Sequence, residues 1–143
     1  QAIQTPCNIP GACGANSLWS YVIGSGWKCS YLPGYKMKNH SDWAYGCEPQ
    51  FHLSCNKNES KFYFLSHVDF YGNDFWVFLN YTLNHYKDIC LKSCDCKAFQ
   101  YTLRHGYTIC HPKMLLLNGS HYPNLNGNIY LKLPKNKLLS NNS

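Results

Sequence analysis

The sequence predicts a small, disulfide-rich fold in two parts, in which one helix packs on a small antiparallel sheet in the second part. Nine cysteines in a chain of 143 residues fall into two clusters, at residues 7–47 and 55–110. Such a density is typical of small secreted domains that are held by cross-links. The first part is rich in Gly and Pro as well as Trp and Tyr, whereas from about residue 60 the sequence contains aromatic-rich runs that are typical of strands. One later segment has the periodicity of a helix.

The first part, residues 5–50, shows no sustained apolar periodicity. Its landmarks are the loop from Cys7 to Cys13, a turn at Pro33-Gly34 and an aromatic stretch that ends at Cys47. Because this part has few Leu, Ile and Val residues to bury, we expect disulfides to supply much of its stability.

The second part, residues 52–134, is predicted to be a sheet with one helix. Short strands are expected at residues 61–64, 75–78, 98–103, 107–111 and 129–133, with Arg104-His105-Gly106 as the turn of a hairpin. The helix is predicted at residues 83–94, where Leu83, Tyr86, Cys90, Leu91 and Cys94 recur at spacings of three and four. The polar tail, residues 135–143, is expected to be flexible.

Five Asn-X-Ser/Thr acceptor sites for glycosylation indicate passage through the secretory pathway. They are Asn39, Asn58, Asn80, Asn118 and Asn141. Five sites exceed the number that chance predicts for this composition, and an oxidising compartment also explains the cysteines. We therefore expect an extracellular or cell-surface location.

Neither a leader peptide nor a membrane-spanning run is recognisable in the sequence. Residues 1–6 have no basic start and no apolar core. The longest aliphatic run, Met114 to Leu117, is far shorter than the roughly 20 residues that cross a bilayer. We expect a mature chain or a fragment, tied to a membrane only through a spanning segment that it lacks.

Charge and titratable residues argue against several classes of function. The net charge of +6 comes from dispersed lysines and one arginine, Arg104, so there is no basic stripe for nucleic acid. A zinc site at Cys90, Cys94, Cys96 and Cys110 is disfavoured, because only one half of the usual paired spacing is present. Seven carboxylates without close pairing, and the absence of kinase motifs, predict no catalytic residue and no cofactor.

Several motifs, taken in order along the chain, resemble one family. In the first part they are Cys13-Gly14, Cys29 with Pro33-Gly34-Tyr35, and Asp42-Trp43 with Gly46-Cys47. In the second part they are residues 53–56, 68–72, 88–99, 110–113 and 128–134. These motifs are similar to the extracellular region of plant S-domain receptor-like serine/threonine kinases, the G-type lectin or S-locus glycoprotein-like group. The resemblance implies a degenerate EGF-like module at residues 5–50 and an α+β PAN/apple module at residues 52–134.

The resemblance also implies a disulfide pattern. The family has further cysteines where this chain has Trp19, Tyr31 and Tyr86. In the EGF-like part the implied pair is Cys13 with Cys29, which leaves Cys7 and Cys47 either bonded to each other or free. In the PAN-like part the implied pairs are Cys90 with Cys96 and Cys55 with Cys94, with Cys110 as the candidate free thiol. Cys90 with Cys110 is the main alternative, because Cys90 reaches Cys96 only if the helix ends near residue 93.

For function, the resemblance implies a non-catalytic extracellular contact module, since the family's kinase domain is absent from this chain. Its partner would be another receptor ectodomain or an extracellular protein ligand, and its role dimerisation or ligand presentation in cell-surface signalling. The candidate contact surface is the run Phe75, Trp76, Val77 and Phe78, because four consecutive large apolar residues cannot all face inward in a strand. The aromatic residues Trp27, Trp43, Phe64 and Phe99 are expected in the core.

Two alternatives remain open. The first is a carbohydrate-binding module that uses exposed aromatic rings, since flat amphipathic rings stack on sugars. The second is a non-functional product of a truncated gene, which the three replaced cysteines suggest.

Overall fold

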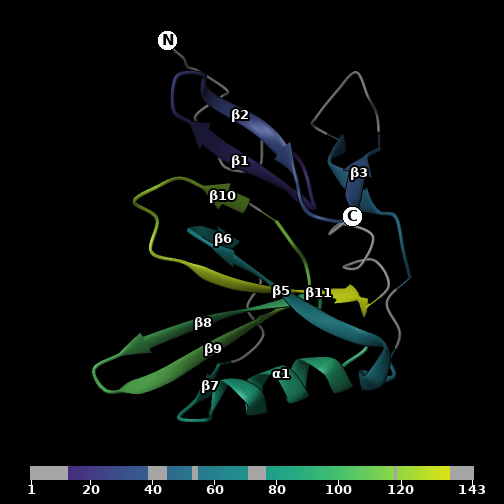
Figure 1. Ribbon diagram of the computed structural model, residues 1–143, viewed down its shortest axis with the longest axis vertical. Helices are drawn as coiled ribbons and strands as arrows, with labels where there is room; N and C mark the ends of the chain where they lie inside the picture. The colour runs from purple at the N-terminus through teal and green to yellow at the C-terminus, as the bar shows by residue number, and fades with distance from the viewer. Residues whose placement is uncertain (1–12, 39–44, 53–54, 71–76, 118, 136–143) are drawn as a thin grey trace.

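The computed structural model describes residues 13–38, 45–52, 55–70, 77–117 and 119–135 (Figure 1). These residues form one α-helix, α1 (Leu83–Lys92), a short 3-10 helix, η3 (Lys57–Glu59), and strands in three sheets. The strands are β1 (Ser17–Val22), β2 (Gly26–Tyr31), β3 (Tyr35–Met37), β4 (Cys47–Pro49), β5 (Ser60–Ser66), β6 (Val68–Phe70), β7 (Phe78–Leu79), β8 (Ala98–Arg104), β9 (Tyr107–Lys113), β10 (Gly119–His121) and β11 (Asn128–Pro134). The prediction of a small disulfide-rich chain with one helix and mostly sheet is confirmed. The finer assignment to EGF-like and PAN/apple modules stays a prediction.

The larger sheet is antiparallel throughout and has the strand order β5-β11-β8-β9-β7. The predicted hairpin at its centre is confirmed as β8 and β9, joined at His105 and Gly106. Both turn residues have positive φ values, 54° and 86°, as the tight turn of a two-residue hairpin requires. Figure 1 shows this hairpin projecting beyond the rest of the sheet, with α1 lying along one face.

Helix α1 begins and ends with specific hydrogen bonds. At its N-terminus the Thr82 Oγ1 accepts a bond of 3.2 Å from the His85 backbone N–H. At its C-terminus the Lys132 Nζ donates to the carbonyl oxygens of Cys90 and Ser93, each at 2.8 Å. Lysine at this end of a helix satisfies orphan carbonyls and complements the helix dipole. Lys132 therefore ties β11 to the helix.

The second sheet is mixed and joins the two predicted parts of the chain. Its strand order is β2-β1-β10-β6, in which β1 and β10 run parallel and the other pairs are antiparallel. Gly119 in β10 has no room for a side chain, since a Cβ there would lie 2.6 Å from the Ser17 carbonyl oxygen and 2.7 Å from the Phe70 ring. This close approach lets β1 from the first part pair with β10 from the second.

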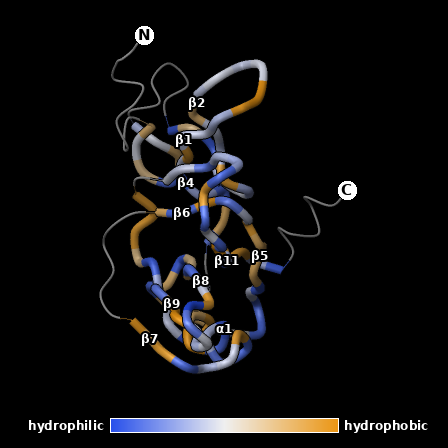
Figure 2. Tube along the Cα trace, turned by 90° about the vertical axis from the view of Figure 1, so that its left-hand side faces the viewer, coloured by the Kyte–Doolittle hydropathy of each residue, from blue (hydrophilic) through white to orange (hydrophobic). Residues whose placement is uncertain are grey.

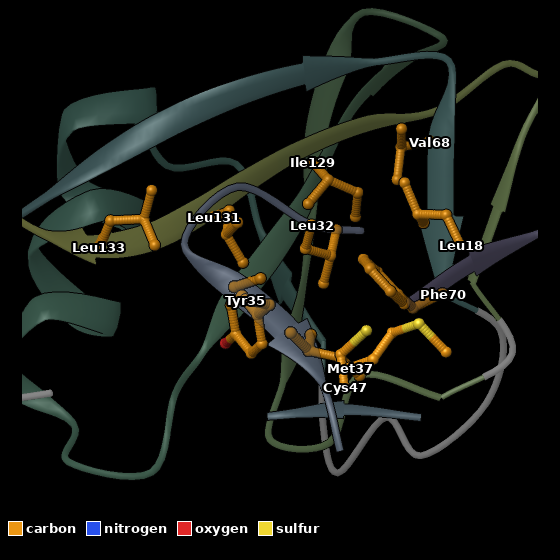
Figure 3. Packing of buried hydrophobic residues seen from close by; sticks show 12 residues of the cluster. Leu18, Leu32, Tyr35, Met37, Cys47, Val68, Phe70, Ile129, Leu131 and Leu133 are labelled. Atoms are coloured by element: carbon orange, nitrogen blue, oxygen red, sulfur yellow. The ribbon is translucent and has the colours of Figure 1, made fainter. Parts of the chain in front are cut away.

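The first hydrophobic core is mainly aliphatic and covers the face of the larger sheet that lies away from α1. In β11, Ile129, Leu131 and Leu133 point to this core, while the residues between them point toward the helix. Leu18, Leu32, Tyr35, Met37 and Cys47 reach the same core from the first part of the chain, and Val68 and Phe70 from β6 (Figure 3). The two predicted parts thus share one core.

The second core lies between the larger sheet and α1 and is mainly aromatic. Its buried members are Tyr86, Cys90, Cys96, Phe99 and Cys110. Phe99 stacks on Tyr130 with ring centroids 5.1 Å apart, and Phe62 meets Phe99 edge-on at 5.2 Å. Strand alternation thus gives the sheet two buried faces of different chemistry.

Three sequence predictions need correction. The hairpin β1–β2 was not predicted, because its small, polar and aromatic residues give no clear alternation. Of the predicted strand at residues 75–78, Phe78 is in β7 and Val77 is not in a strand, whereas Phe75 and Trp76 lie outside the described residues. Among the aromatic residues expected in the core, Phe99 is buried but Trp27 and Phe64 are 41% and 48% exposed, whereas Trp43 lies outside the described residues.

Candidate functional site

A groove of about 550 Å³ lies between the β8–β9 hairpin and β6. Its polar lining residues are Asp69, Gln100, Thr102, Arg104, His111 and Asn126, and its aliphatic ones are Val77, Leu79, Ile109 and Leu125. The volume lies in the range of sites that take drug-sized ligands. The groove is therefore large enough to act as a binding site.

Strand alternation determines which side chains of the hairpin face the groove. In β8, Gln100, Thr102 and Arg104 line it, while Phe99 and Tyr101 pack toward α1. The register places His111 opposite Gln100, and Ile109 opposite Thr102. The polar residues at every second position of this hairpin were a readable signal of a solvent-facing side, but the sequence alone did not single them out.

The groove has different charges at its two ends. The Arg104 side chain is exposed at the turn end of the hairpin, and Asp69 lies at the β6 end. The Asp69 Oδ1 accepts a 2.8 Å hydrogen bond from the Phe70 backbone N–H, which fixes its orientation. Between them, the His111 Nδ1 is buried and has no hydrogen-bond partner among the described residues.

The chemistry of the groove suits binding. Its hydrogen-bonding groups are amides, a hydroxyl, an imidazole, a guanidinium and a carboxylate, set between aliphatic walls. Within the part of the chain that the structure describes, no cluster of His, Cys, Asp and Glu could hold a metal ion. The groove can recognise a molecule that has both polar and aliphatic groups.

Of the candidate contact residues that the sequence predicted, the structure places Val77 at the groove and Phe78 away from it. Val77 is 46% exposed and lines the groove. Its role in a contact stays a prediction. Phe78 instead packs in the second core and pairs with Cys110 across β7 and β9. Leu79, 52% exposed, joins Val77 on the groove side, and Figure 2 shows β7 as a hydrophobic segment at one end of the molecule.

Three disulfides hold the chain around these elements. Cys13 bonds to Cys29, Cys55 to Cys94 and Cys90 to Cys96. These are the pairs that the family resemblance implies. The last pair is possible because α1 ends at Lys92, which brings the Cα atoms of Cys90 and Cys96 to 5.3 Å from each other.

Among the described cysteines, two have no disulfide partner. Cys110, the predicted free thiol, is buried in the second core, and burial raises its pKa to about 12. Cys47 is not bonded to any described cysteine, and its side chain, 0% exposed, packs in the first core near Met37 (Figure 3). Cys7 lies outside the described residues, so the suggested Cys7–Cys47 bond stays a prediction. Burial also raises the pKa of Cys47.

Two residues at positions where the resembling family has cysteine make specific contacts. The Tyr86 hydroxyl lies 3.0 Å from the Thr108 Oγ1 and accepts a hydrogen bond from the Tyr81 backbone N–H, so it connects α1 to β9. Trp19 is 8% exposed and stacks on Trp27 with ring centroids 5.3 Å apart. At these two positions, a hydrogen-bonding tyrosine and a stacked tryptophan thus stand where the resembling family has cysteine.

Two of the predicted glycosylation sites are in described residues and both are exposed. Asn58 lies in η3, and Asn80 has a positive φ of 65° just before the N-terminus of α1. Asn39, Asn118 and Asn141 lie outside the described residues. Glycosylation at all five sites stays a prediction.

A second surface feature is an aromatic cluster on the β1–β2 hairpin. The exposed Trp27 ring stacks on Trp19 and meets Tyr21 and Tyr122 edge-on, with centroids 5.4 and 5.7 Å away. Sequence reasoning assigned Trp27 to the core, so it missed this cluster. The two aromatic residues Trp19 and Tyr21, spaced two apart, were the available signal.

Comparison with known proteins finds one informative relative. The chain is 38% identical, over 98% of its length, to the putative receptor protein kinase ZmPK1 of Zea mays. It spans 17% of the length of that maize protein, and its 143 residues contain no kinase-sized domain. No protein-family model matches the chain. Within the described ranges, no helix has the length and apolar character needed to cross a membrane.

Proposed function

We propose that this chain is a non-catalytic extracellular contact module of a plant receptor-like kinase. The observation that carries the proposal is the 38% identity to a segment of a receptor protein kinase that is about six times longer, as the 17% coverage implies. Such a short matching segment fits a module that serves a larger receptor. The three disulfides support an oxidising location, because structural disulfides persist outside the reducing cytosol.

In this proposal, residues 5–50 are a degenerate EGF-like module and residues 52–134 a PAN/apple module of the S-domain receptor-kinase group. The partner is another receptor ectodomain or an extracellular protein ligand. The groove beside β8 and β9 provides the contact surface, with Val77 and Leu79 as its exposed apolar rim. Exposed apolar residues rimmed by polar ones are typical of protein interaction sites.

Site-specific photo-crosslinking on the plant cell surface tests this function. The chain is displayed through a tether, with a benzophenone amino acid in place of Leu79 in the groove or of Asn84 on the exposed side of α1. We expect the Leu79 variant to crosslink to an extracellular protein or receptor ectodomain, identified by mass spectrometry, and the Asn84 variant to give little product. Equal crosslinking at both positions, or none at either while surface labelling confirms display, would contradict the proposal.

A carbohydrate-binding function is the second candidate, and the Trp27 cluster favours it. An exposed indole ring flanked by Tyr21 and Tyr122 provides a flat platform for a sugar face. A glycan array probed with the wild-type chain and the Trp27→Ala variant tests it, with Tyr45→Ala, at another exposed aromatic residue, as the control. Binding that Trp27→Ala removes and Tyr45→Ala retains would establish this second function.

The third reading of the sequence, a non-functional truncated product, stays a prediction, but two contacts favour a maintained fold. Trp19 and Tyr86 both make specific packing or hydrogen-bonding contacts where the resembling family has cysteine. These contacts are expected of a sequence that maintains its fold without the two disulfides.

A further inference from the structure

We propose that the groove between the β8–β9 hairpin and β6 binds an extended peptide segment that carries an acidic residue opposite Arg104. The inference rests on the proposed function, since it names the chemistry of the partner that the contact module would recognise. Size, lining and charge each support it.

The shape of the groove fits a short extended chain. Its floor follows β8 from Gln100 to Arg104, a distance of about 13 Å at roughly 3.3 Å per strand residue. An extended peptide of four or five residues has the same length. With about 550 Å³ available, such a segment can be accommodated along the hairpin.

The lining matches the chemistry of a peptide better than that of a sugar. Gln100 and Asn126 each offer an amide with both a donor and an acceptor, which is the complement of a peptide group. Leu79, Ile109 and Leu125 form aliphatic walls for side chains. None of the described residues that line the groove is Phe, Tyr or Trp, so these residues offer no large ring on which a sugar could stack.

Charge determines which peptide fits best and in which direction. The exposed guanidinium of Arg104 has a rigid fork of donors that matches a carboxylate. Asp69 at the opposite end disfavours a second acidic residue there. The net charge of +6 on the whole chain also attracts an acidic partner. The acidic side chain is therefore expected at the hairpin-turn end.

Fluorescence anisotropy with defined peptides tests the proposal on the full, disulfide-intact chain. The probes are labelled, capped pentapeptides of four Val residues and one terminal Glu, Gln or Lys. We expect the Val/Glu peptide to bind about five- to tenfold more tightly than the Val/Gln peptide, because a charge-assisted hydrogen bond is roughly twice as strong as a neutral one. Arg104→Gln is expected to remove this preference, and Lys28→Gln, which removes the same charge from the exposed face of β2, to retain it.

Specific outcomes would overturn the proposal. Equal binding of the Glu and Gln peptides, or a preference that survives Arg104→Gln, excludes recognition of an acidic residue by this groove. Displacement of the Val/Glu peptide by a uronic acid oligosaccharide, with tighter binding of the sugar, identifies an acidic glycan as the occupant instead. If the peptides fail while the Leu79 crosslink succeeds, the contact function stands and only the partner chemistry is wrong. Failure of both rejects the contact function itself.

Discussion

The two faces of the β5-β11-β8-β9-β7 sheet are buried in different ways. On one face, aliphatic residues from β11 meet Leu18, Leu32 and Met37, which are remote in sequence and held by packing. On the other, an aromatic cluster lies under α1, where the Cys55–Cys94 and Cys90–Cys96 disulfides and the Lys132 hydrogen bonds fasten neighbouring elements.

The difference shows two solutions to stabilising a small chain. A helix of ten residues is only marginally stable alone, so the two disulfides and the Lys132 hydrogen bonds hold α1 against the sheet. The aliphatic face depends on Leu18, Leu32, Tyr35, Met37 and Cys47 being in place, because they cover a surface that would otherwise be exposed. The β8–β9 hairpin projects beyond the rest of the sheet (Figure 1). The groove lies on this hairpin, where the aliphatic residues of the first core no longer cover the sheet.

The largest effect is expected from Phe70→Ala on the aliphatic face. Phe70 is 0% exposed and contacts the site where β1 and β10 pair, so its loss leaves a cavity that should lower the free energy of unfolding by about 3–5 kcal/mol. Denaturant unfolding under oxidising conditions measures it. Phe64→Ala, at a 48% exposed ring, is the control and should cost about 1 kcal/mol or less. Similar losses in both variants would show that the aliphatic face is not held by tight packing.

Removal of the Cys55–Cys94 disulfide, on the helix face, should give the next largest decrease in the free energy of unfolding. The bond closes a loop with a sequence separation of 39, and the double variant Cys55→Ser with Cys94→Ser should lose about 2–4 kcal/mol in the chain-entropy model. The Cys90–Cys96 bond, with a separation of 6, should contribute less. Chemical denaturation of both double variants compares them. A reversed order would mean that native-state contacts, and not loop closure, determine these contributions.

Tyr86→Phe should have a smaller effect that is local to α1. The change removes the hydroxyl that lies 3.0 Å from the Thr108 Oγ1 and leaves the Tyr81 N–H without its acceptor. A loss of about 1–2 kcal/mol is expected. Hydrogen exchange should show faster opening of α1 and unchanged protection of β1. An equal loss of protection in β1 would contradict the independence of the two faces.

The smallest predicted effect is a pH dependence of the free energy of unfolding, to which the buried Lys132 and the buried Cys110 thiol contribute with opposite signs. Burial lowers the pKa of Lys132 from 10.5 to about 8, although Asp95 acts in the opposite sense. Between pH 8 and 9 the unfolded chain therefore binds more protons than the folded chain, and the free energy of unfolding should rise by about 1 kcal/mol. Above pH 9 the raised pKa of Cys110, about 12, opposes this rise, because the folded chain keeps a proton that the unfolded chain loses.

Urea midpoints at pH 7.5, 8.5 and 9.5 measure this profile. Lys132→Met provides the control, since it removes the titrating group and should abolish the rise between pH 8 and 9. A rise that persists in this variant would assign the effect to another group.

Much of the second part of the chain was predictable from local patterns. The spacing of Leu83, Tyr86 and Cys90 located the helix, and the turn at Arg104-His105-Gly106 located the hairpin, because both are determined by neighbours in sequence. The pairing of β1 with β10 was not predictable, since it joins Trp19 to Ser120 across a hundred residues and depends on the missing side chain of Gly119. The buried role of Lys132 was missed for a similar reason, because its partners lie on α1.

The sequence by itself determined the disulfide-rich class, the single helix and the central hairpin, since cysteine density, helical periodicity and turn residues act over short distances. It also contained the alternation of Gln100, Thr102 and Arg104 with aromatic residues. Only the tertiary structure decided which face of the hairpin stays open, because that depends on how far Leu18, Leu32, Tyr35, Met37 and Cys47 extend over the sheet. The groove is thus a product of packing between distant segments, which no local pattern encodes.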